Sequence, residues 1–133
     1  MPRLQAEIAV AGFPYGNVLT TPALTFGQLA DIRGLNGEDE VKRLSIFAQP
    51  GDAGGPVYDN GGAVLGMLLP KEQINGQNLP PEVSFSVNAS EIISSITDAG
   101  LSVETTDTLA YMTPELLTLM AADMTVLVSC WSN

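Results

Sequence analysis

The stretch Gly51-Asp52-Ala53-Gly54-Gly55-Pro56 carries more structural information than any other part of this chain. Gly51 has no Cβ, so its backbone can adopt a conformation that turns its N–H group inward. The N–H of Ala53 provides a second donor, and two backbone donors that converge on one point stabilise a developing oxyanion. The alternative interpretation is an ordinary glycine-rich hairpin connection, which two adjacent glycines alone would favour.

The composition indicates one small globular domain with an acidic surface. The chain has 133 residues, of which 45% are hydrophobic, and 15 acidic residues against 5 basic ones give a net charge of -10. This charge argues against nucleic acid and anionic membrane surfaces as partners. The sequence has no apolar run long enough to span a bilayer, and no signal peptide precedes its first strand pattern.

The residue types that are missing restrict the chemistry. The chain contains no histidine, which is the usual general base of serine and cysteine hydrolases and the commonest zinc ligand. Its one cysteine, Cys130, excludes an internal disulfide, and without a base it is expected in the core or as a partner of an outside cysteine rather than as a nucleophile. We therefore expect no metal site and no cofactor. The acidic run at 38–40 is expected at a solvated loop tip.

The hydrophobic pattern predicts short strands separated by turns that contain glycine or proline. Between 23 and 33 the alternation is mixed, and its candidate inward residues are Leu24, Phe26, Leu29 and Ile32. Asn60-Gly61-Gly62 predicts a hairpin turn. The six segments expected as strands are 6–13, 17–21, 42–48, 55–59, 63–69 and 82–87. Such a meander favours a small antiparallel barrel.

One helix is predicted directly after the last of these strands. Asn88 is placed to cap its N-terminus, with Glu91 three residues further on, and Gly100 is placed to end it. The residues expected on its buried face are Ile92, Ile93, Ile96 and Ala99.

Several motifs together resemble the second β-barrel of trypsin-like serine proteases, and the HtrA (Deg-type) branch most closely. Besides the stretch around Ala53, the similar segments are Ala11–Gly16, Asp59–Met67 and Val83–Asn88, and the resemblance covers about residues 6–101. It implies a six-stranded antiparallel Greek-key barrel with a closing helix over 1–101, followed by a helix and strand over 102–133. It also implies an extracytoplasmic location, either periplasmic or secreted.

The resemblance assigns roles to individual positions. Ala53 occupies the place of the nucleophilic serine, the N–H groups of Gly51 and Ala53 form the oxyanion hole, and Asp52 anchors the loop through a cation or backbone donors. In the other interpretation, Asp52 is simply a turn-stabilising residue. The positions implied to bind a small or medium apolar side chain of a polypeptide substrate are Phe47, Ala48, Met67, Leu68 and Leu69. These residues can equally be read as core strand.

The same resemblance implies that catalysis cannot occur in this chain alone. In that family the catalytic histidine and aspartate lie on a first barrel, which is expected upstream, and the methyl group of Ala53 cannot attack a carbonyl. We therefore expect no proteolysis, either from an engineered serine-to-alanine variant or from a naturally inactive homologue. The rival hypothesis is a non-catalytic pseudoprotease that serves as a peptide-binding or assembly module.

The tail is expected to add a helix and a strand. Thr113-Pro114-Glu115 predicts a helix start, with a capping residue, a proline at the first position and an acid in the first turn. Its apolar face is expected from Leu116, Leu117, Leu119, Met120 and Ala121, and 124–131 is expected to be a strand. The strand could complete a barrel in a neighbouring molecule and form a homodimer, or the tail could dock on its own barrel.

Overall fold

The computed structural model describes residues 4–13, 22–33, 39–70, 80–102 and 112–126. The elements are strands β1 (Glu7–Gly12), β2 (Ala23–Asp31), β3 (Val41–Ser45), β4 (Pro56–Asp59), β5 (Val64–Leu68) and β6 (Val83–Asn88), the 3₁₀ turn η2 (Pro50–Asp52), and helices α1 (Ala89–Asp98) and α2 (Pro114–Met124).

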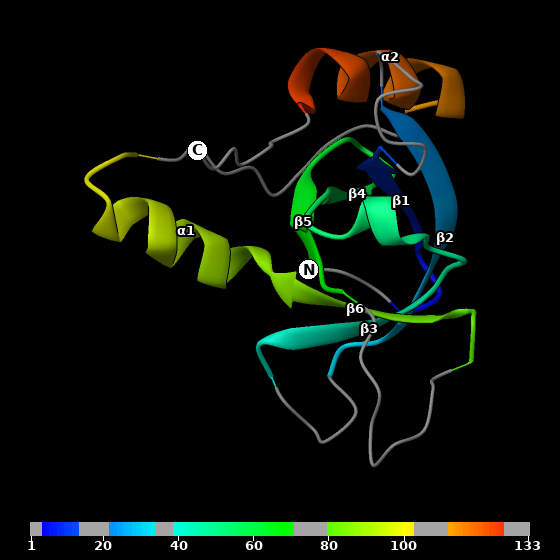
Figure 1. The fold of residues 1–133 in the computed structure, drawn as a ribbon, viewed down its shortest axis with the longest axis horizontal. Helices are drawn as coiled ribbons and strands as arrows, with labels where there is room; N and C mark the ends of the chain where they lie inside the picture. The colour runs from blue at the N-terminus through cyan, green and yellow to red at the C-terminus, as the bar shows by residue number, and fades with distance from the viewer. Residues whose placement is uncertain (1–3, 14–21, 34–38, 71–79, 103–111, 127–133) are drawn as a thin grey trace, which may run out of the picture.

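Within these residues the strands close into one barrel (Figure 1). The order around the barrel is β1-β2-β3-β6-β5-β4, and each neighbouring pair is antiparallel, including β1 with β4. Closure pairs every strand with two neighbours, so no long strand edge stays open. The predicted six-stranded antiparallel barrel is therefore confirmed.

Strand β1 shows how the sequence separates the inside of the barrel from the outside. Successive side chains of a strand point to opposite faces, so Ile8 and Val10 face the interior while Ala9 and Ala11 face outward. The interior cluster of buried residues consists of Ile8, Val10, Leu29, Leu44, Ile46, Val57 and Leu68. A second buried cluster forms outside the barrel, where α2 covers the small side chains of β1.

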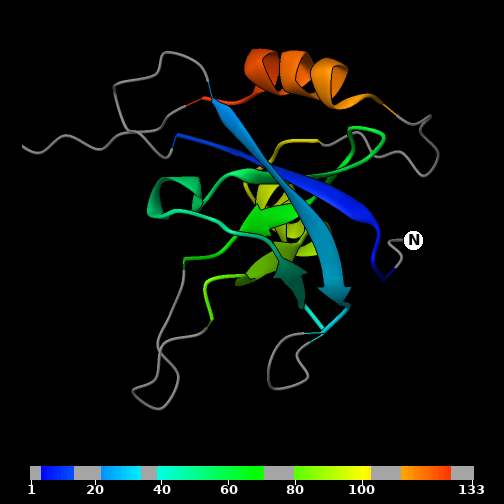
Figure 2. The ribbon, with the colours of Figure 1, turned by 90° about the vertical axis from the view of Figure 1, so that its right-hand side faces the viewer.

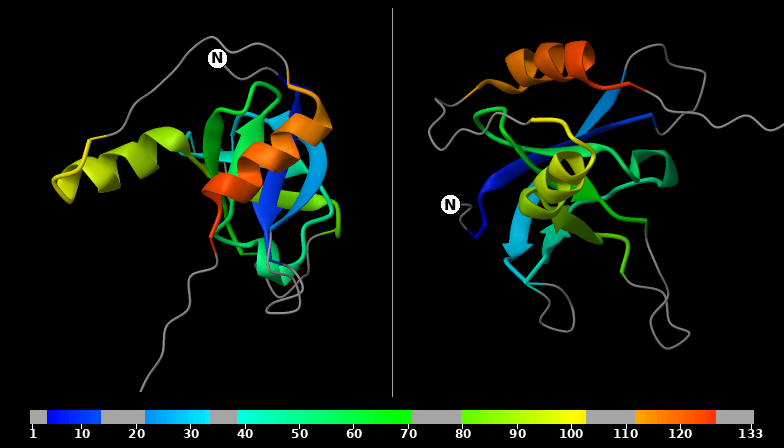
Figure 3. Two further views of the ribbon diagram at one scale, coloured as in Figure 1. Left: turned by 90° about the horizontal axis from the view of Figure 1, so that it is seen from above. Right: turned by 90° about the vertical axis from the view of Figure 1, so that its left-hand side faces the viewer.

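The two helices relate to the barrel in different ways. Helix α1 continues directly from β6 and extends away from the barrel, and none of its residues is fully buried (Figure 1). Helix α2 lies across the outside of β1 and β2 (Figures 2 and 3) and buries Leu117 and Ala121. The start of α2 is tied to the β4–β5 hairpin, because the N–H of Met112 donates to the carbonyl of Asn60 at 2.7 Å.

The hairpin turn predicted at 60–62 is present between β4 and β5. The Asp59 carboxylate stabilises it, because one oxygen accepts hydrogen bonds from the N–H groups of Gly61 and Ala63, both at 2.9 Å. The positive φ of 89° falls on Gly62, the last residue of the predicted motif.

Strand β2 corrects the prediction for residues 23–33. Leu29 is buried inside the barrel as expected, but Leu24 and Phe26 pair with the outward-facing Ala11 and Ala9, and paired residues share a face. Leu24 packs against the outer cluster that α2 covers, whereas Phe26 stays 49% exposed on the same face, and the alternation showed neither outcome. Ile32, also predicted inward, lies beyond the end of the strand and is largely exposed.

Other expectations meet mixed outcomes. Ala99 was expected on the buried face of α1 but is exposed, and Ile92, Ile93 and Ile96 are only half-buried. Met124 is the last residue of α2 rather than the first of a strand. The expected strand at 17–21 and residues 127–131 lie outside the described residues. Among the described helices, none is long and apolar enough to cross a membrane.

Candidate functional site

The stretch around Ala53 forms the connection from β3 to β4. It begins with the 3₁₀ turn η2, in which the N–H of Asp52 donates to the carbonyl of Gln49 at 2.9 Å. Ala53 follows at the next position and is half-buried, whereas Gly51 is exposed. The convergence of the Gly51 and Ala53 N–H groups on one point stays a prediction.

Main-chain hydrogen bonds fix the second half of this loop to the barrel. The N–H of Gly54 donates to the carbonyl of Leu68 at 2.7 Å, and the N–H of Leu68 donates to the carbonyl of Gly55 at 2.9 Å. Gly54 has a φ of 84°, which disfavours any residue with a Cβ. Gly55 lies so close to β1 that a Cβ there would overlap the carbonyl oxygen of Ala11. Gly54 is therefore required by its backbone conformation, and Gly55 by its close contact with β1.

Asp52 is completely buried beneath the loop. One carboxylate oxygen accepts a hydrogen bond from the N–H of Gln49 at 3.0 Å, so the side chain braces the turn in which it sits. The other oxygen has no hydrogen-bond partner among the described residues and lies beside Gly12 at the end of β1. The N–H of Phe13 donates to the carbonyl of Gly51 at 3.1 Å, which joins the end of β1 to the same turn.

A cavity of about 350 Å³ opens beside Ala53. It is lined by the end of β1, by loop residues 51 and 53–56, and by the end of α2 with the two residues that follow it; the lining residues are Ala11, Gly12, Phe13, Gly51, Ala53, Gly54, Gly55, Pro56, Met124, Thr125 and Val126. Its volume lies near the lower end of the range for small-ligand sites, about 300–1,000 Å³. The cavity brings together two of the predicted site positions, Gly51 and Ala53.

The residues predicted to bind a substrate side chain do not line this cavity. Leu68 is buried in the barrel interior and contributes its backbone to the loop, and Ala48 packs against the same interior. Phe47 is 68% exposed, Met67 is exposed on β5, and Leu69 is half-buried. A second substrate-binding position at these residues stays a prediction.

Sequence reasoning missed the contribution of Met124, Thr125 and Val126. The β-branched residues in this stretch predicted a strand, and nothing in the pattern linked it to the loop 70 residues earlier in the chain. Gly12 and Phe13 belong to a segment already singled out for its resemblance, so their place at the cavity could have been inferred.

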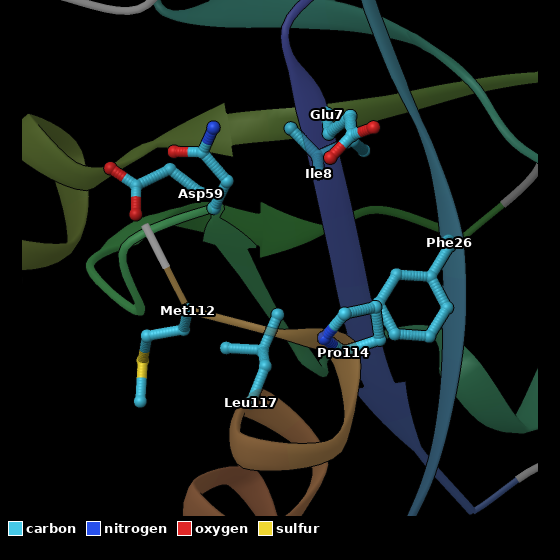
Figure 4. Close-up of a pocket in the computed structure, with 8 residues that line it drawn as sticks. Glu7, Ile8, Phe26, Asp59, Met112, Pro114 and Leu117 are labelled. Carbon is cyan, nitrogen blue, oxygen red and sulfur yellow. The ribbon is translucent and has the colours of Figure 1, made fainter. Parts of the chain in front are cut away.

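A second, smaller cavity lies where α2 meets the barrel (Figure 4). Its lining includes Ile8, Phe26, Asp59 and Leu117, and its volume of about 30 Å³ suits no more than one or two water molecules. One oxygen of the Asp59 carboxylate already accepts two hydrogen bonds within the hairpin. We therefore interpret this cavity as a small packing gap between α2 and the barrel rather than as a ligand site.

The described residues provide few charged groups for chemistry. They contain no group of three or more histidine, cysteine, aspartate or glutamate residues that could hold a metal ion. Burial lowers the pKa of Lys42 on β3, but this side chain donates to the Asn88 amide oxygen and does not line the cavity. The cavity itself has no charged side chain among its described lining residues.

Sequence comparison finds a relative that matches most of this chain. No family model matches the chain. Over 136 residues it is 29% identical to the uncharacterized protein y4bJ of Sinorhizobium fredii, a match that covers 96% of this chain and 21% of y4bJ.

Among solved structures, two of Rv3671c from Mycobacterium tuberculosis are similar. A serine-to-alanine mutant in the inactive form matches with a TM-score of 0.54 and 23% identity, over 80% of this chain and 53% of that chain. The Rv3671c protease in an inactive form matches with a TM-score of 0.55 and 24% identity, over 76% and 52%. The aligned part of the present chain thus covers about half the length of these structures, and its fold, one closed barrel, is similar to part of the Rv3671c protease.

Proposed function

We propose that this chain is the second, nucleophile-bearing barrel of a trypsin-like serine endopeptidase of the HtrA type, with Ala53 at the position of the attacking serine. The observation that carries the proposal is the loop from Gly51 to Gly55. It is fixed by main-chain bonds between two strands of a protease-like barrel, and it has a cavity beside Ala53. The substrate we propose is a polypeptide, and the location we propose is extracytoplasmic.

The loop and its surroundings can position a carbonyl group but cannot attack it. Acyl transfer requires a nucleophile and a base that accepts its proton. The Ala53 side chain has no lone pair, and the chain contains no histidine to act as the base. The proposal therefore assigns binding to this chain and assigns the missing base to a first barrel elsewhere in the full protein.

A pseudoprotease that binds peptides or supports assembly is the second candidate. It is favoured by the combination of an intact loop with an alanine at its centre, because the fixing hydrogen bonds do not involve the side chain of Ala53. The two candidates differ for a longer form of the protein. Ala53→Ser should restore cleavage of casein if the partner barrel supplies a histidine and an aspartate, and it should leave the protein silent if the pseudoprotease is correct.

The position of Ala53 can be tested in this chain without any base. A cysteine is a few per cent thiolate at neutral pH, so Ala53→Cys supplies a nucleophile that needs no histidine. Its thiolate would add to the carbonyl carbon of phenyl thioacetate, place negative charge on the carbonyl oxygen and expel thiophenolate. Cys130→Ser removes the natural thiol, and Ser94→Cys on the exposed side of α1 is the matched control.

The reaction rate of each thiol is measured with two reagents, phenyl thioacetate for acylation and iodoacetamide for alkylation. Alkylation by iodoacetamide creates no oxyanion, so it corrects for thiolate fraction and accessibility. One oxyanion donor is worth about 10²–10³ in rate, and we expect the ratio of acylation to alkylation to be at least about tenfold higher for Ala53→Cys than for Ser94→Cys. Equal ratios at the two positions would refute the assignment of this loop.

A further inference from the structure

We propose that the end of α2 and residues Met124–Val126 form the second wall of the cleft beside Ala53, so that this single chain holds a complete binding site for a short, neutral, apolar peptide segment. The peptide nature of the ligand rests on the proposed function. The site itself rests on the cavity that these residues share with the loop.

The first wall is built from the loop and the end of β1. The hydrogen bond from the N–H of Phe13 to the carbonyl of Gly51 joins the two segments. Gly55 packs against the backbone of Ala11, so these parts cannot move apart without losing both contacts. This wall is therefore fixed before any ligand arrives.

The second wall is held in place by the docking of α2. Leu117 and Ala121 are buried against Ala9, Ala11 and Tyr58 on the outer side of the barrel. One turn further on, the N–H of Thr125 donates to the carbonyl of Ala121 at 2.9 Å, and its hydroxyl lies 3.4 Å from the Tyr58 hydroxyl. These contacts place Thr125 and Val126 at the cavity beside the loop.

The conformation and chemistry of this wall suit an extended peptide. Thr125 has φ -105° and ψ 131°, which is the conformation of a strand, and because its N–H donates to the carbonyl of Ala121, a peptide would pair with its carbonyl group. Met124 is 53% exposed and Val126 is 75% exposed, so both apolar side chains are available at the cavity. Because no charged side chain of the described residues lines the cavity, a charged segment would lose hydration without gaining a partner.

The first experiment locates binding by NMR in the complete chain. The probe is acetyl-Ala-Val-Ala-amide, and acetyl-Ala-Asp-Ala-amide is the matched charged control. We expect the apolar peptide to shift the amide signals of Gly12, Ala53, Gly55 and Val126 and to leave those of α1 unchanged, and we expect the charged peptide to shift none of them. Shifts confined to other parts of the chain, equal shifts with both peptides, or no shifts at millimolar peptide would overturn the proposal.

The second experiment tests whether Met124 and Val126 contribute contacts to the bound peptide. The double variant Met124→Ala, Val126→Gly removes apolar contacts from exposed positions, and Leu119→Ala on the outer side of α2 is the control. If these side chains form the wall, the double variant should bind the apolar peptide at least about tenfold more weakly than the unchanged chain, and the control should bind it with unchanged affinity. Unchanged or tighter binding by the double variant would overturn the proposal. Phenyl thioacetate is too small to need this wall, so the acylation test of the loop can succeed or fail independently.

Discussion

Helices α1 and α2 show that a helix's own pattern does not decide how it packs. Residues 89–98 have the clearer amphipathic pattern, with isoleucines on one face, yet no residue of α1 is fully buried. In α2 the apolar residues are spread around the helix, yet Leu117 and Ala121 are among the most buried residues of the chain. The difference lies in the partner surface, because β1 presents Ala9 and Ala11 outward and a helix can approach such small side chains closely.

The comparison predicts different roles for the two helices. The docking of α2 completes the outer cluster and forms part of the cavity, whereas α1 contacts β5 and β6 without fully burying any of its residues. We therefore expect the free energy of unfolding to depend strongly on α2 and weakly on α1.

Leu117→Ala should destabilise the protein by about 2–5 kcal/mol, because it leaves a cavity between α2 and the barrel. Leu119→Ala on the same helix is the control, since Leu119 is 65% exposed and its truncation should change stability by less than about 0.5 kcal/mol. Urea unfolding followed by circular dichroism measures both. Similar losses for the two variants would mean that α2 is not docked as described.

Thr113→Ala should cost about 1 kcal/mol, because the Thr113 hydroxyl accepts a hydrogen bond from the N–H of Leu116 at the start of α2. Thr113→Ser keeps the hydroxyl and should retain most of the stability. The corresponding residue of α1, Asn88, makes no capping hydrogen bond with its side chain. A loss of stability equal in both Thr113 variants would contradict a capping role.

Gly100→Ala should cost about 1 kcal/mol, because Gly100 has a φ of 87° at the end of α1, while a Cβ there would meet no other atom within 4 Å. Its N–H donates to Thr97 and that of Leu101 donates to Ile96, which closes the last turn of the helix. We expect faster amide hydrogen exchange in the last turn of α1, with the barrel amides unchanged. Faster exchange throughout the barrel would show that α1 is coupled to the core more tightly than its exposure indicates.

The smallest expected effect comes from Lys42, whose side chain lies near the start of α1. It should make the free energy of unfolding depend weakly on pH. Burial lowers its pKa below the ordinary 10.5, so between the two values the unfolded chain holds a proton that the folded chain releases. The free energy of unfolding should therefore rise slightly as the pH increases through the lowered pKa towards about 10.5.

The variant Lys42→Met should remove this rise. Arg43→Gln, which changes a residue that keeps its charge at these pH values, should not. Urea midpoints measured across the range decide between the two outcomes, and an identical slope in all three proteins would contradict the burial of Lys42 as the cause.

The barrel was predictable from sequence because its strands carry local signals. Turn residues such as Asn60-Gly61-Gly62 and the β-branched residues of segment 6–13 act through their immediate neighbours along the chain. Leu24 was placed on the wrong face because the outer helix α2 covers it, and Phe26 because it is an outward apolar side chain that stays 49% exposed. Periodicity cannot reveal a cover that comes from a segment 90 residues later.

Of the candidate site, the loop conformation was predictable. Gly54 and Gly55 were expected to allow tight turning and close approach, which the φ of Gly54 and the contact of Gly55 with Ala11 support, whereas the oxyanion-hole roles of Gly51 and Ala53 stay predictions. The wall from Met124 to Val126 was not found, since its place depends on where Leu117 and Ala121 dock. Residue type fixed the local geometry, and only the tertiary contacts brought the two walls together.

The bonds that hold the glycine pair have a consequence for how such a chain can change over time. They join backbone atoms of Gly54, Gly55 and Leu68, so the fold is indifferent to whether position 53 carries a methyl or a hydroxymethyl group. A hydroxyl group at that position can be gained or lost by a single substitution with almost no cost in folding. Under the proposed function, such a change alters the chemistry of the loop and leaves its scaffold in place, while turnover also needs a base that this chain lacks.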